Sequence, residues 1–222
     1  MEAPSAAFSI QPVQIDWDRL VAKRPTVLDT INAMPAYLLK PKILMLLDAE
    51  KQPTNRLILK LMWATGARVS GVLALKPTSF VDYSYDAGVV LKTLKQWHGS
   101  PTQKALKRSP KSYIAIIDQA LEGRIQIYLY KGPFKKIERI YPMCRQSVNR
   151  HIYALVERGG GASFVISSHK FRYSFAIHLL LNERLLKYLS QQLGHKTVDS
   201  TEINTNVFTV DGTHFMDGVD FQ

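Results

Sequence analysis

The chain of 222 residues contains a single cysteine, Cys144, and no long apolar run. One cysteine excludes a disulfide framework and a cysteine-rich metal site. No stretch approaches the roughly 18 consecutive apolar residues that cross a bilayer, and no secretory signal opens the sequence. We therefore expect a cytoplasmic protein with no membrane partner.

Acidic residues are also scarce: the chain has 18 Asp and Glu but 29 Lys and Arg, which gives a net charge of +11. Such a charge indicates a polyanionic partner, although loose non-specific affinity would explain it equally well if nothing else pointed to DNA. Residues 207–222 contain three Asp and no Lys or Arg, so we expect this end to stay off DNA. Residues 92–111 contain no acid and six basic residues: Lys92, Lys95, Lys104, Lys107, Arg108 and Lys111.

A hydrophobic content of 46% with 21% charged residues is ordinary for a globular protein, and the length suits one core with arms. Residues 1–34 are weakly periodic and are predicted to form an N-terminal arm, with Trp17 packing on the core or on a neighbour. Residues 35–207 form the predicted domain. Residues 208–222 form a tail in which apolar residues alternate with acids.

The first half of the domain shows two helical stretches and two strand-like stretches. Pro41 suits the first turn of a helix over 41–49, and Thr54 is the expected cap of a second helix that stops at Gly66. Residues 87–94 and 112–117 are β-branched and alternating, and 96–110 are basic and rich in turn residues. This pattern predicts a hairpin with a long tip.

The middle of the chain is less decisive. Residues 121–139 are ambiguous, and a short strand over 125–130 is the favoured interpretation. From Arg145 onwards Val148, Ile152 and Leu155 have helical spacing. The three glycines at 159–161 are expected to act as a hinge before the next helix.

The C-terminal third carries the strongest chemical pattern. Ser168 is the expected N-cap of a helix whose apolar residues recur at steps of three and four, and His169 and Arg172 project from one side near its start. A second helix over about 184–193 ends at Gly194, and His195 follows. A helix N-terminus with an Arg and a His is suited to bind an anion such as a phosphate.

Two segments resemble the boxes of the tyrosine recombinases, the integrase-type site-specific recombinases. A-T-G-A-R-V-S-G-V-L-A-L (64–75) is similar to the first box in Thr65, Gly66, Arg68, Ser70 and Leu73 or Leu75. S-S-H-K-F-R-Y-S-F-A-I-H-L (167–179), followed by L-G-H and S-T-E-I-N-T-N-V, is similar to the second. The matches there are His169, Arg172, Ser174, Phe175, Ala176, His178, Leu179, Leu193, Gly194, His195, Thr201, Ile203, Thr205 and Val207.

The resemblance implies phosphoryl transfer between DNA strands. Arg68 and Arg172 would hold the scissile phosphate and stabilise its growing charge. His169 and His195 would add hydrogen bonds to its oxygens or help move the nucleophile's proton. Lys95 would act as general acid, with Lys104 and Lys107 as rivals, while a solvated basic loop remains the alternative. No metal and no nucleotide cofactor is required.

Two positions depart from the family pattern. Asn204 stands where the family has its tyrosine nucleophile, and Gly71 stands where an acid is usual. An amide cannot form a phosphotyrosyl bond, and neither Tyr173 nor Tyr188 is a plausible substitute. Either the tyrosine was replaced to trap a DNA complex or the protein is a naturally degenerate recombinase that only binds. We predict DNA binding without cleavage.

The resemblance also implies an α+β, mostly helical catalytic domain with a small antiparallel β-sheet. Its partner would be double-stranded DNA in the bacterial cytosol or nucleoid, bound as a dimer per site and a tetramer in synapsis. The tail would dock on a neighbouring protomer, unless it folds on its own domain. Predicted DNA contacts, with a solvated face as the alternative, are Lys92, Lys104, Lys107, Arg108, Arg145, Asn149, Arg150 and Lys170.

Overall fold

The computed structural model describes residues 13–30, 37–83, 86–92, 111–116, 118–161, 164–195, 198–202, 205, 211–212 and 215. Five residues with predicted roles lie outside this part of the chain: Lys95, Lys104, Lys107, Arg108 and Asn204. The side chain of Lys92 lies outside it too, although its backbone belongs to a strand.

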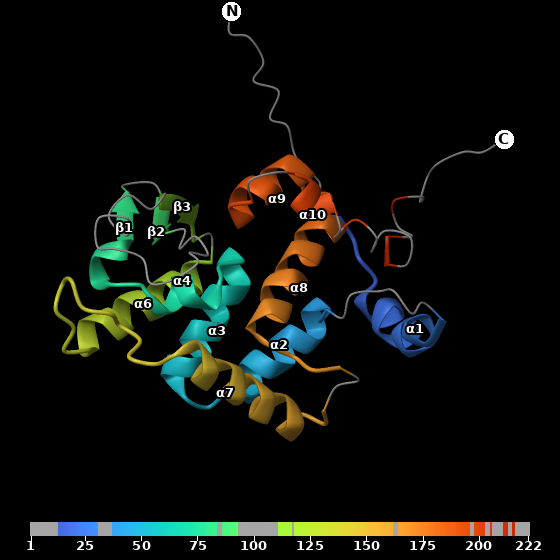
Figure 1. Cartoon of the computed structure of the whole chain (residues 1–222), viewed down its shortest axis with the longest axis horizontal. Helices are drawn as coiled ribbons and strands as arrows, with labels where there is room; N and C mark the ends of the chain where they lie inside the picture. The colour runs from blue at the N-terminus through green and yellow to red at the C-terminus, as the bar shows by residue number, and fades with distance from the viewer. Residues whose placement is uncertain are drawn as a thin grey trace, which may run out of the picture.

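Helices dominate the structure, and one small sheet lies at its edge (Figure 1). This arrangement confirms the expected α+β class. The elements are α1 (Trp17–Thr30), α2 (Lys40–Ala49), α3 (Pro53–Thr65), α4 (Val69–Leu73), the 3-10 turn η1 (Pro77–Ser79), β1 (Phe80–Tyr83), β2 (Asp86–Lys92), β3 (Lys111–Ala115), α6 (Gln119–Lys131), α7 (Arg145–Arg158), α8 (Ser168–Leu181), α9 (Leu186–Leu193) and α10 (Asp199–Glu202).

The helices α2 and α3 form as their sequences predict, with one correction at a cap. A proline opens each helix, and α3 ends at Gly66, which has a φ of 63° in the left-handed region. The predicted cap Thr54 lies inside the first turn of α3, and Gln52 is the N-cap. The Thr54 hydroxyl instead lies 3.2 Å from the hydroxyl of Tyr128, so it ties α3 to α6.

The sheet is antiparallel with the order β1-β2-β3. The two predicted strands correspond to β2 and β3 within two residues at each end, and β1 was not predicted. Val89 pairs with Ile114 across β2 and β3, and both side chains are buried in the main core. The sheet therefore packs on the helices through one face.

The predicted short strand over 125–130 is wrong, because these residues belong to α6. The Asp118 carboxylate caps this helix by accepting hydrogen bonds from the backbone N–H groups of Ala120 and Leu121. Leu121 and Ile125 lie one turn apart and are buried. The cap and the four-residue spacing of these two buried residues favour a helix.

The helix α7 begins at the predicted residue, Arg145, and the three glycines close its far end. Gly160 and Gly161 have φ values of 87° and 74°, and the Gly161 N–H donates to the Val156 carbonyl. Ser167, one residue before the predicted Ser168, is the N-cap of α8. The following helix α9 begins at Leu186, two residues later than expected, and ends at Gly194 with a φ of 61°.

The predicted N-terminal arm contains a helix, α1, that packs on the rest of the domain. Leu20 of α1 is buried against Tyr37, Leu39, Ile177 and Leu181 in a cluster separate from the main core. In Figure 1, α1 lies beside α8 on the side of the molecule opposite the sheet. Trp17 packs on its own chain, where its ring centroid lies 5.6 Å from that of His178.

Within the described ranges, no helix is long and apolar enough to cross a membrane.

Candidate functional site: a cationic pocket between α4, α8 and α9

The turn between α3 and α4 carries Arg68 and is rigidly held. The Thr65 hydroxyl donates to the Leu61 carbonyl at 2.5 Å and accepts from the Ala67 N–H at 3.2 Å. Gly66 reverses the chain with its positive φ, and Arg68 then becomes the N-cap residue of α4. The Arg68 guanidinium makes no hydrogen bond or ion pair with another described residue, so its donors are free for a ligand.

Arg172 lies on the second turn of α8 and joins three segments of the site. Its guanidinium donates to the Gly66 carbonyl at 2.6 Å and to the Leu193 carbonyl at 2.5 Å. Burial, followed by the nearby charge of Arg68, lowers the pKa of Arg172, yet the group stays charged at neutral pH. Two carbonyl dipoles therefore fix this cation, and no carboxylate among the residues that the structure describes pairs with it.

His195 follows α9 and contacts Arg172 directly. Its Nε2 lies 3.3 Å from a guanidinium nitrogen of Arg172, and its Nδ1 lies 2.7 Å from the Thr201 hydroxyl. Since guanidinium only donates, Nε2 must accept, and Nδ1–H donates to the threonine. Burial and then Arg172 and Arg68 lower the pKa of His195 to about 4. The ring is therefore a neutral Nδ1–H tautomer at neutral pH.

His169 lies on the first turn of α8 and is exposed. Partial desolvation lowers its pKa first, and the charges of Arg145, Arg172 and Arg68 add to the effect. This influence shows that Arg145 of α7 contributes to the same positive field. Three arginines, Arg68, Arg145 and Arg172, thus act on the location of His169, and this concentration of positive charge favours a bound anion.

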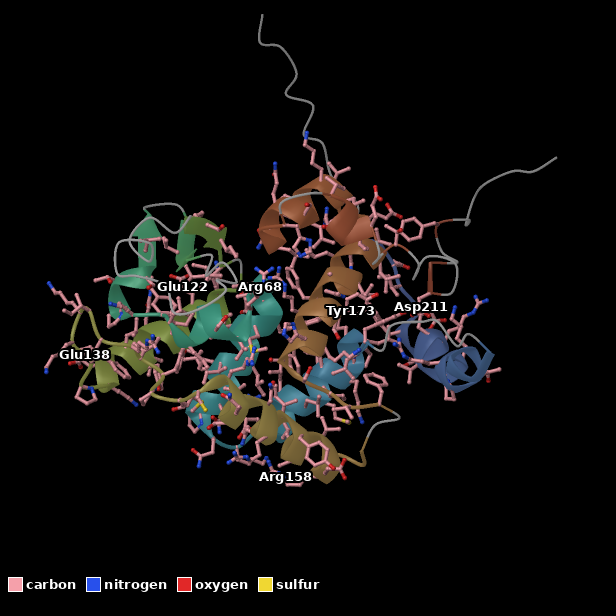
Figure 2. The ribbon with its side chains drawn as sticks, in the orientation of Figure 1. Arg68, Glu122, Glu138, Arg158, Tyr173 and Asp211 are labelled. Carbon is pink, nitrogen blue, oxygen red and sulfur yellow. The ribbon has the colours of Figure 1, made fainter. Side chains whose placement is uncertain are left out.

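A small cavity of about 40 Å³ lies beside the two arginines. Its lining comes from the α3–α4 turn, the sheet, α8 and the end of α9, and none of its eleven lining residues is acidic: Ala67, Arg68, Ser70, Gly71, Leu91, Ser112, Ile114, Arg172, Gln192, Leu193 and Gly194. Gly71 lies here without the carboxylate that the family pattern has. Figure 2 shows Arg68 near the middle of the molecule, between the sheet and α8. The cavity suits one small anionic group.

Leu91 and Ser112 line this cavity, so the end of β2 and β3 nearest their connecting loop lies beside it. Lys95, the predicted general acid, lies three residues beyond the end of β2 and outside the described residues. Its position remains a prediction.

The side chains of the remaining predicted DNA contacts differ in solvent exposure and in their contacts within the protein. Arg145 and Arg150 are exposed on α7. Lys170 is half-buried, with its ammonium 6.0 Å from the centroid of the Phe164 ring. Asn149 is engaged, because its side-chain oxygen accepts a hydrogen bond of 3.0 Å from the backbone N–H of Ser168.

Thr201, which has no predicted role, is fully buried and orients His195. The match of Thr201 to the family segment was the available signal. A polar cluster away from the pocket, where Asp211 meets Tyr37, Arg24 and Lys23, was also not predicted. No sequence signal linked residues so distant along the chain. The described residues contain no group of three or more His, Cys, Asp or Glu that could hold a metal.

Comparisons with known proteins agree with this site. Residues 37–209 match the sequence model described as "Phage integrase family". The resolvase of Escherichia coli strain K12 is 29% identical over 221 residues, which cover 90% of this chain and 81% of the resolvase. Tyrosine recombinase XerC of Bacillus pumilus strain SAFR-032 is 26% identical, with 86% of this chain and 64% of XerC covered.

Solved structures share the fold. The XerH site-specific recombinase, in a post-cleavage complex with its palindromic difH substrate, superposes with a TM-score of 0.64 at 18% identity, over 84% of this chain and 53% of XerH. The chain thus spans about half the length of XerH. The catalytic domain of bacteriophage HP1 integrase gives a TM-score of 0.57 at 21% identity, over 85% of this chain and 96% of that domain. Since the family model matches well over half of its residues, this chain belongs to the phage integrase family and is a tyrosine recombinase by sequence and fold.

Proposed function

We propose that the scaffold is that of a site-specific recombinase that cuts and rejoins DNA through a 3′-phosphotyrosyl intermediate. The carrying observation is the pocket lined by Arg68 and Arg172, with no acid in its described lining and with His195 in contact with Arg172. A scissile phosphate gains negative charge as it is attacked, and pre-positioned cations in a partly dry site stabilise that charge. The catalytic unit would extend over 35–207, with an N-terminal segment (1–34) and a tail (208–222).

Each side chain has a proposed role consistent with its surroundings. Arg68 has free donors for the non-bridging oxygens, and Arg172 holds the pocket together while it contributes its charge. His169, exposed on the first turn of α8, would donate to the phosphate or move a proton. Neutral His195 presents an acceptor at Nε2, which orients Arg172 or receives the proton of a nucleophile. Lys95 would protonate the leaving 5′ oxygen.

The chain with Asn204 would bind DNA without cleaving it. An amide carries no ionisable hydroxyl, so the covalent step has no attacking atom. Tyr173 does not replace it, because burial raises its pKa to about 12 and its ring packs edge-on against Tyr37. The alternative function is a naturally degenerate DNA-binding protein on the same scaffold.

Double-stranded DNA is the proposed partner, in the cytoplasm of a bacterium. The net charge of +11 supports it, as do the structural neighbours, which include a lambda integrase dimer bound to a core site. Exposed Arg145 and Arg150 on α7 would contact the duplex, together with Lys170 and the basic residues of the hairpin. We propose a dimer per site and a tetramer in synapsis. Asp211 of the tail contacts its own chain, so a link between protomers would come from the rest of the tail.

Restoring the nucleophile tests this proposal. The substrate would be supercoiled DNA that carries a site bound specifically by the unmodified chain. We expect Asn204→Tyr to form a detergent-resistant adduct with this DNA and to relax it. The unmodified chain should do neither. Asn204→Phe is the matched control, since it supplies the ring without the hydroxyl. Adding Arg172→Ala to Asn204→Tyr should abolish the adduct.

Two outcomes would contradict the proposal in different ways. An adduct with the unmodified chain would show that Asn204 does not block cleavage. Tight and specific binding by Asn204→Tyr with no adduct would favour the binding-only alternative.

A further inference from the structure

The first turn of α8 lacks a cap from its own sequence. Ser167 is the N-cap residue, but its side chain makes no capping hydrogen bond. Helix N-termini leave several backbone N–H groups without intrahelical partners, and an uncapped end frays more easily. This terminus carries His169 and leads into Arg172, so any fraying would move both side chains of the pocket.

The missing acceptor comes from another helix. The Asn149 Oδ1 of α7 accepts the Ser168 N–H at 3.0 Å, across 19 residues of sequence. Ser168 is 3% exposed, and its hydroxyl is buried without a partner in the structure. The backbone bond to Asn149 is therefore the polar attachment of Ser168 to α7.

A second residue of α7 faces the same turn. Arg145 precedes Asn149 by four residues, which places both on one side of the helix. The charge of Arg145 acts on His169, as the lowered pKa of that histidine indicates. By contrast, Arg150 lies on the exposed side of α7 and makes no hydrogen bond or ion pair with the other described residues.

We propose that Asn149 is a positioning residue that caps α8 from α7 and holds His169 and Arg172 in place for the scissile phosphate. The inference rests on the proposed function and replaces direct contact with DNA as the main role of Asn149. The helix α7, whose exposed arginines are proposed to contact DNA, would then also fix the position of α8, which carries His169 and Arg172.

The first test does not depend on activity. Hydrogen exchange of the Ser168 amide, followed by NMR, should be slowed by the bond to Asn149. Asn149→Ala should speed this exchange by about tenfold, the order expected for loss of one cap, and should shift the ring resonances of His169. Asn149→Asp keeps an acceptor of the same shape and should restore both signals. Arg150→Ala, the matched neighbour, should change neither.

The second test uses chains that carry Asn204→Tyr. Asn149→Ala should slow adduct formation at saturating DNA by about tenfold while the Kd for DNA changes less than twofold. Arg150→Ala should do the reverse, with weaker binding and a smaller dependence of log Kd on salt. If Asn204→Tyr proves inactive, the catalytic proposal fails while the exchange data still decide whether Asn149 caps α8. Unchanged exchange of Ser168 in Asn149→Ala, or a loss of DNA affinity that matches the loss of rate, would overturn the inference.

Discussion

Burial lowers the pKa of three histidines in the described part of the chain, His169, His178 and His195, and His178 is the most buried of them. Its ring centroid lies 5.6 Å from that of Trp17 and 5.1 Å from that of Trp63. Burial, followed by the charge of Lys40, lowers its pKa to about 4. The sequence pattern matched this histidine to the family box but could not tell a packed ring from a ligand of phosphate. The two tryptophans settle that question, since they enclose the ring away from the pocket.

Acid should therefore destabilise the protein through His178. The pKa of this histidine is about 6.5 in the unfolded state and about 4 in the folded state. Between these two values the unfolded state binds a proton that the folded state does not bind. The contribution of neutral His178 to the free energy of unfolding is therefore fully present above pH 6.5 and is lost as the pH falls towards 4. At pH 4.5 we expect His178 to account for a loss of about 2–3 kcal/mol in the free energy of unfolding. Urea titrations at pH 7.5 and 4.5 measure it.

His178→Phe keeps an aromatic ring between the tryptophans and cannot take up the proton. The difference in stability between the two pH values should be smaller in this variant by about 2 kcal/mol. Equal differences in the two proteins would show that His178 is not the responsible group.

At the scale of elements, the sequence predicted the helices with strong periodicity and failed where the decisive partner lay elsewhere in the chain. Residues 125–130 were predicted as a short strand, although the Asp118 cap and the one-turn spacing of Leu121 and Ile125 favour the helix α6. Asn149 was assigned to DNA because no local signal shows that its acceptor faces the N–H of Ser168. The fold class, by contrast, follows from the motifs and the hairpin pattern, and these are short-range features.

The turn from α3 to α4 offers a sharp test of element geometry. Gly66 has a φ of 63°, and a Cβ added there would lie 2.3 Å from the Phe175 ring. Gly66→Ala should therefore lower the free energy of unfolding by about 2–4 kcal/mol, because backbone strain and the clash both oppose folding. The displaced turn would also move the carbonyl that holds Arg172. Thermal unfolding measures the first effect.

Gly71→Ala is the control for this prediction. Gly71 lies within α4, where the nearest atom to an added Cβ is 3.9 Å away. A glycine in a helix interior is less favourable than alanine, so this variant should be neutral or more stable by up to about 1 kcal/mol. A Gly66→Ala protein as stable as Gly71→Ala would show that the turn tolerates a side chain.

At the scale of the whole molecule, ion pairs join α1 to Asp211, which lies 187 residues after Arg24 in the chain. Asp211 is 2% exposed and accepts from the Tyr37 hydroxyl, and it lies within ion-pair distance of Arg24 and Lys23. Figure 2 shows Asp211 on the side of the molecule where α1 lies. The Arg24 guanidinium also lies 3.9 Å from the centroid of the Tyr37 ring. At this point the tail contacts its own domain, which is the predicted alternative to docking on a neighbouring protomer.

Removing the Asp211 charge should weaken the attachment of α1 to the rest of the protein. Asp211→Asn leaves Arg24 close to buried apolar groups without its anion, a change that costs about 3 kcal/mol in comparable buried pairs. We expect a lower midpoint of urea unfolding and faster proteolytic cleavage between residues 13 and 37. Asp48→Asn is the matched control, because Asp48 pairs with Arg56 at 2.6 Å but is 76% exposed, and exposed pairs contribute at most about 1 kcal/mol. Should both variants unfold and cleave alike, the contact at Asp211 would not be what holds α1 on α8. A selective effect at Asp211 would instead show that the predicted arm is an integral part of the domain.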